Sequence, residues 1–92
     1  MTKERAEYTV LMLAERKGYK IDDKHYFEYL GTWKSPLDDN LLSHIFLYRE
    51  PQPTAKDGTP LPVGHPRYWI SNDFSTRPMG GYWLEYANSR MS

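Results

Sequence analysis

The chain has 92 residues, no cysteine, and 12 basic and 12 acidic side chains that give a formal net charge of zero. This length predicts one domain over residues 1–92, and the absence of cysteine excludes disulfides, thiolate metal sites and a cysteine nucleophile. No apolar run is long enough to cross a bilayer, and the N-terminal MTKERAEYTV has no apolar signal-peptide segment, so we expect a cytoplasmic protein without membrane contact.

Charge is unevenly distributed along the chain. Residues 1–20 carry five basic and three acidic side chains, residues 21–50 carry three and six, and residues 51–92 carry four and three. Binding to a nucleic-acid duplex needs a basic face that releases counterions from several phosphates. Since no segment supplies such a face, nucleic acid is the less favoured partner.

Aromatic residues dominate the apolar composition. Eight Tyr, three Trp and three Phe stand against three Ile and two Val. Aromatic rings must therefore supply much of the core, and we expect several Tyr at its boundary, with the hydroxyl toward water or a partner.

The first predicted element is a helix over residues 3–17. Thr2 is a suitable N-cap and Gly18 a suitable C-terminal stop. An apolar stripe with helical spacing runs along it, formed by Ala6, Val10, Leu13 and Ala14. A strand over residues 8–14 is the alternative, but Ala, Glu, Arg and Lys at both ends favour the helix.

The second predicted element, over residues 22–30, is ambiguous. Asp22 could cap a short helix that ends at Gly31. The aromatic run over residues 26–33 equally fits a strand, because aromatic side chains favour pleated, half-buried surfaces. We slightly favour the helix.

The third predicted element is a helix over residues 36–49. Ser35 is a good N-cap, Pro36 suits the first helical position, and Asp38 can complete a capping box. Leucines, Ile45 and a phenylalanine follow with helical spacing, and a proline ends the element. Its second half, HIFLYR, has a strand-like composition and is the alternative.

Residues 51–66, PQPTAKDGTPLPVGHP, contain five prolines and two glycines. This composition excludes a helix or a central strand and predicts an extended loop, with a tight turn at residues 56–59. We expect the loop to contact the domain through Leu61 and Val63.

The C-terminal section predicts two antiparallel strands, at residues 68–72 and 82–87, joined by a turn-rich link. Alternation places Tyr68, Ile70, Tyr82, Leu84 and Tyr86 toward the helices and leaves Trp69 and Trp83 on the other, less buried face. Because Trp is highly buried on average, we also expect at least one of these two Trp to lie inside.

Together these elements predict a small α+β domain of two or three helices followed by an antiparallel β-ribbon. The order resembles the layout of a winged helix at the coarsest level. In such a layout the third helix would read DNA, yet it begins with Asp38 and Asp39, which would repel phosphates.

No catalytic or metal-binding constellation emerges. His25, His44 and His65 lack the spacing of a helical zinc site, and the Asp22–His25 stretch is better explained as a capped, solvated segment. The Arg77–Gly81 tip could form an anion-binding nest, but Pro and Gly are ordinary turn residues. We therefore expect a protein that is not an enzyme and has no metal or cofactor.

The function favoured by the sequence is a small protein-binding module. The dipeptide Tyr-Trp occurs twice, and Trp and Tyr are among the residue types most enriched at interface hot spots. The composition resembles that of small cysteine-free accessory proteins of phages and mobile elements, including inhibitors of host enzymes. The partner would be another protein or a second copy, bound through Trp69, Trp83, Tyr68, Tyr82, Arg67 and Arg77.

The alternative function is binding of single-stranded nucleic acid. Exposed rings would stack on bases, and Arg67, Arg77 and Arg90 would contact the backbone.

Overall fold

The computed structural model describes residues 1–35, 41–61 and 66–91. These residues form two helices and a four-stranded antiparallel sheet, which confirms the α+β class. In chain order the elements are α1 (Lys3–Arg16), β1 (Tyr26–Lys34), β2 (Leu42–Arg49), β3 (Tyr68–Ser71), β4 (Thr76–Pro78) and α2 (Gly81–Met91).

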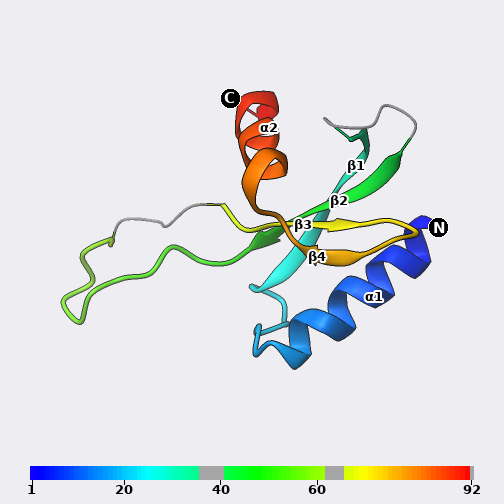
Figure 1. The fold of residues 1–92 in the computed structure, drawn as a ribbon. Helices are drawn as coiled ribbons and strands as arrows, with labels where there is room; N and C mark the ends of the chain where they lie inside the picture. Colours follow the sequence, from blue (N-terminus) through cyan, green and yellow to red (C-terminus); the bar gives the residue numbers. More distant parts are fainter. Residues whose placement is uncertain (36–40, 62–65, 92) are drawn as a thin grey trace.

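The sheet forms the middle of three layers. Its strand order is β1-β2-β3-β4, with each strand antiparallel to the next. Figure 1 shows α1 on one side of the sheet and α2 on the other. Each helix covers its own cluster of buried side chains, so the aromatic residues are divided between two separate cores.

Helix α1 forms where the sequence predicts it. The Thr2 side chain accepts a hydrogen bond from the Arg5 amide at 3.2 Å, and Lys17 ends the helix before Gly18. Gly18 has a φ of 90°, a left-handed conformation that favours glycine at this position. The predicted stripe is inside: Ala6, Val10 and Ala14 are fully buried and Leu13 is half-buried.

The helix favoured over residues 22–30 is wrong, and the alternative strand is right. Asp22 does act as a cap, but of a turn: its Oδ1 accepts hydrogen bonds from the amides of Lys24 and His25, both at 2.9 Å. Strand β1 begins directly after this turn and continues through Gly31, which has a φ of 114° at a bulge in the pairing with β2. Glycine therefore serves as a bulge residue here and does not end a helix.

The Asp22 turn gives a testable pH dependence. A hydrogen bond from the His25 ring, at 2.8 Å, is the main reason why the pKa of Asp22 falls from its ordinary value of 3.8 to about 2. Because this pKa is lowered in the folded state, the carboxylate stabilises the fold above pH 3.8, and the contribution is lost as the pH falls toward 2.

We expect the variant Asp22→Asn to be less stable than the wild type at neutral pH and the difference to shrink progressively below pH 4. Urea unfolding midpoints of both proteins between pH 7 and pH 2 measure this. A stability difference that stays constant over the whole range would contradict the assignment.

The helix predicted over residues 36–49 is also wrong in the part that the structure describes. Residues 36–40 lie outside the described part of the chain, and Leu42–Arg49 is strand β2, as the composition of HIFLYR had suggested. Both faces of β2 are covered: Ile45 and Leu47 belong to the α2-side core, and Phe46 to the α1-side core. A strand buried on both faces reads as an unbroken apolar run, without the alternation that would have identified it. The winged-helix layout thus remains unconfirmed.

Residues 51–61, the described part of the proline-rich loop after β2, extend away from the sheet as an arm (Figure 1). The predicted tight turn is confirmed, since the Gly58 amide donates to the Ala55 carbonyl at 2.9 Å and Asp57 Oδ1 accepts from the Thr59 amide. An isolated bridge joins Thr54 to Pro60. The predicted contact at Leu61 is wrong because this side chain is exposed, and Val63 lies outside the described residues.

The prediction of a C-terminal β-ribbon is right for its first strand and wrong for its second. Residues 68–71 form β3 as predicted, but its partner β4 comes from the expected link, and residues 81–91 form helix α2. Trp83 and Ala87 are four residues apart and both buried, which is helical spacing.

Candidate functional site

The residues predicted to bind a partner do not form one surface. Trp69 is fully buried beneath α1, while Trp83 and Tyr68 are buried in the core on the α2 side. The prediction that Trp69 and Trp83 form an exposed cross-strand pair is therefore wrong. The expectation that at least one of them lies inside is confirmed. Tyr82 on α2, Arg77 on β4 and Arg67, which directly precedes β3, are exposed.

Two of the arginines expected near nucleic acid lie against rings of this chain. The Arg67 guanidinium lies over the Tyr19 ring, 5.7 Å from its centroid, and that of Arg90 lies over Trp33, at 4.6 Å. Trp33 itself is buried. These pairs give the arginines an internal role, because a cation over a ring face stabilises the fold. The third arginine, Arg77, is exposed on the short strand β4.

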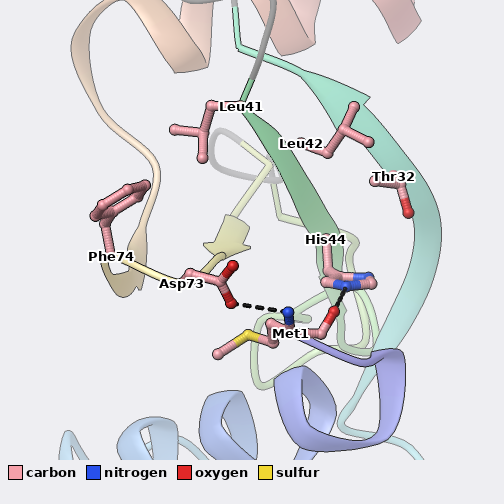
Figure 2. Close-up of a pocket in the computed structure, with 7 residues that line it drawn as sticks. All are labelled: Met1, Thr32, Leu41, Leu42, His44, Asp73 and Phe74. Carbon is pink, nitrogen blue, oxygen red and sulfur yellow. Dashed lines mark hydrogen bonds and ion pairs between the residues drawn. The ribbon is translucent and has the colours of Figure 1, made fainter.

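The candidate site is a cleft of about 490 Å³ at the end of the sheet where the chain begins. The cleft is lined by Met1, Thr32, Leu41, Leu42, His44, Asp73 and Phe74. Figure 2 shows Phe74 and Leu41 on one side, Leu42 and Thr32 on the other, and His44 and Met1 at the base. The cleft thus joins β1, β2, the N-terminus and the β3–β4 turn, and it has a polar base and an apolar rim.

The polar base is held by a chain of hydrogen bonds through His44. Its Nε2 donates to the Met1 carbonyl at 3.0 Å, so in the neutral ring Nδ1 accepts from the Tyr29 hydroxyl at 2.9 Å. The Tyr29 hydroxyl also bonds the Thr32 hydroxyl at 3.2 Å. Both nitrogens of the imidazole are engaged, which favours a structural role for His44 over that of a catalytic base.

Asp73 is the acidic group of the cleft. Its Oδ1 lies 2.8 Å from the terminal ammonium of Met1, and the hydrogen bond with this ammonium is the main cause that lowers the pKa of the carboxyl. The Met1 sulfur in turn accepts a hydrogen bond from the Ser71 hydroxyl at 3.2 Å. Carboxylate and ammonium form a neutral pair, so they add no net charge to the cleft.

The turn between β3 and β4 is fixed by Asn72. This side chain is buried, and its Oδ1 accepts hydrogen bonds from the amides of Phe74 at 2.8 Å and Ser75 at 2.9 Å. Its Nδ2 donates to the Ser43 hydroxyl on β2 at 3.0 Å. Asn72 therefore ties the turn to the sheet and fixes the backbone of Phe74 at its tip.

The rim exposes two large apolar side chains, one on each side of the cleft. Phe74 is 83% exposed and Leu42 is 55% exposed. Sequence reasoning missed both, because Phe74 falls in the predicted turn-rich link and Leu42 in the apolar stripe of the predicted helix over residues 36–49. The available signal was the aromatic in Asn72-Asp73-Phe74-Ser75, since a turn residue with no core to enter leaves its ring in solvent.

Neither a metal site nor a membrane-spanning helix finds support in the part of the chain that the structure describes. No group of three or more His, Asp or Glu side chains among the described residues is placed to hold a metal ion. None of the described helices is long and apolar enough to cross a membrane. Comparison with protein-family models, with curated proteins and with solved structures finds no match for the chain.

Proposed function

We propose that the protein is a small non-enzymatic protein-binding module and that it binds its partner with the rim of the cleft. The observation that carries this proposal is the 83% exposure of Phe74 at the tip of a turn that the buried Asn72 holds in place. A large ring kept in solvent by a fixed turn costs solvation free energy in the free protein, and a partner that covers it recovers that free energy.

The geometry suits a protein partner better than a small substrate. Leu41, Leu42 and Phe74 give an apolar rim, whereas the polar groups at the base already bond to one another. Aromatic anchors with an apolar surround are typical of protein interfaces. The site differs from the pairs of Trp and Tyr that the sequence suggested, but the class of function is the same. A cytoplasmic accessory protein of a phage or mobile element, acting on a host protein, is one context that fits it.

Site-specific photocrosslinking tests this proposal. With benzoylphenylalanine in place of Phe74, we expect covalent adducts to protein after irradiation in cells. The same group in place of Tyr8, which is 68% exposed on α1, serves as the matched control and should give few adducts.

The second change Leu42→Asp should abolish the adducts formed at position 74, because it places a charge on the apolar rim. Equal yields at positions 8 and 74, or adducts to nucleic acid alone, would contradict the proposal; the latter would support the stacking alternative.

A further inference from the structure

We infer that the base of the cleft is a binding site for the amino-terminal residue of a peptide, and that Met1 of the chain itself fills this site in the structure. The site takes a free ammonium, the carbonyl that follows it and a flexible apolar side chain. This inference goes beyond the proposed function, because it concerns the polar base of the cleft and does not require a protein on the rim.

Three side chains hold Met1, and each holds a different group of it. Asp73 accepts a hydrogen bond from the terminal ammonium at 2.8 Å, and His44 Nε2 donates to the carbonyl at 3.0 Å. The Ser71 hydroxyl donates to the sulfur at 3.2 Å. Figure 2 shows Met1 between Asp73 and His44. The Met1 side chain is only 13% exposed, so this residue lies in the cleft as a bound ligand does.

The site is built by the sheet and not by its occupant. His44 and Ser71 are paired across the neighbouring strands β2 and β3, so their side chains lie on the same face. Asp73 follows two residues after Ser71, in the turn that Asn72 fixes. The hydroxyl of Tyr29 bonds His44 Nδ1 at 2.9 Å and orients the ring. Because the fold itself holds these groups in place, little ordering is left to be done when a ligand binds.

Helix α1 does not need Met1 for its start. The Thr2 side chain accepts a hydrogen bond from the Arg5 amide, and the Thr2 carbonyl accepts from the Ala6 amide at 3.0 Å. Removal of Met1 therefore leaves the helix cap in place and vacates the site. When Met1 is present, its tether of one peptide bond gives it a high effective concentration at the site. A free ligand then competes poorly.

Titration with methionine amide, followed by NMR of the backbone amides and by the unfolding midpoint, tests the inference on chains of residues 1–92 and 2–92. For the chain without Met1 we expect saturable shifts at Ser71 and Asp73 and a higher midpoint with ligand. Its affinity should exceed that of the full chain at least about tenfold. N-acetylmethionine amide, which lacks the ammonium, is the matched ligand and should bind about two- to fivefold more weakly, as expected for the loss of an exposed ion pair.

Two carboxylate variants of the 2–92 chain locate the ammonium. Asp73→Asn should remove the preference for methionine amide over the acetylated compound. Glu85→Gln, which removes an exposed carboxylate on α2, should leave that preference unchanged. In the full chain, a nuclear Overhauser contact between the Met1 ε-methyl group and the Ser71 β-protons should show that Met1 fills the site.

The inference is overturned if folded 2–92 does not bind methionine amide, if it binds both compounds equally, or if the full chain shows no contact between Met1 and Ser71. If 2–92 is unfolded without ligand, methionine amide should restore its circular dichroism, and failure to do so overturns the inference as well. None of these results changes the adducts expected at position 74, so the proposed function stands or fails separately.

Discussion

Replacement of Trp69 by alanine is expected to lower the free energy of unfolding by about 3 to 5 kcal/mol, the largest effect of any substitution that we predict. Trp69 is fully buried in the centre of the sheet, and its indole lies edge-on to the rings of Tyr19 and Phe27, with centroid distances of 5.6 and 5.8 Å. A chain of this length has a total stability of about 5 to 14 kcal/mol, so the variant would be partly unfolded at 25 °C if the wild type lies near the lower end.

The matched control is Trp69→Phe. Among the described residues the indole Nε1 of Trp69 is buried without a hydrogen-bond partner, so the loss of this N–H leaves no other group unsatisfied. Phenylalanine retains a ring between α1 and the sheet and should cost less than half as much as alanine. Urea unfolding followed by circular dichroism measures both variants. A loss of unfolding free energy of no more than about 0.5 kcal/mol for Trp69→Ala, as at an exposed position, would contradict the burial of Trp69 between α1 and the sheet.

The sequence predicted those elements that are defined by residues close together in the chain, such as helix caps and tight turns. Thr2 and Gly18 bound α1 as their residue types require, and the turn at residues 56–59 forms from Asp57 and Gly58. In each case the hydrogen bonds that define the element join residues at most five positions apart.

Strand β2 shows why such signals fail elsewhere. Ser35, Pro36 and Asp38 carry good helix-capping chemistry, yet Leu42–Arg49, which the same prediction included in the helix, is a strand. The Ser35 amide bonds instead to the Leu41 carbonyl at 2.9 Å, across the connection between β1 and β2. Pairing with both β1 and β3 and burial on both faces decide the conformation of β2. These are tertiary effects that override propensity.

The candidate site was predictable only in part. The sequence indicated that aromatic residues would supply much of the core, and it favoured a binding role for some of them. Which ring stays outside depends on the division of the core: Trp69 and Trp83 fill opposite sides of the sheet, whereas Phe74 lies in the β3–β4 turn and belongs to neither core cluster. That division follows from two helices on opposite faces, and α2 was not anticipated.

Helix α2 can be tested by a pair of neighbouring substitutions. Trp83 is 7% exposed and packs in the core on the α2 side, where its ring lies 6.0 Å from that of Tyr86. We expect Trp83→Ala to lower the free energy of unfolding by about 3 kcal/mol or more, because it removes the main apolar anchor of the helix. Far-ultraviolet circular dichroism should show a loss of helix, and acrylamide should quench the remaining indole fluorescence more strongly as Trp33 becomes accessible.

The neighbouring variant Tyr82→Ala is the control and decides between helix and strand. Tyr82 is 69% exposed, so on a helix its replacement should change stability by no more than about 0.5 kcal/mol. In the strand that alternation had predicted, Tyr82 would share the inward face with Leu84 and Tyr86, and the costs of the two substitutions would be reversed. A large cost at Tyr82 together with a small one at Trp83 would therefore contradict α2. Equal and small costs would show that this segment does not pack on the sheet at all.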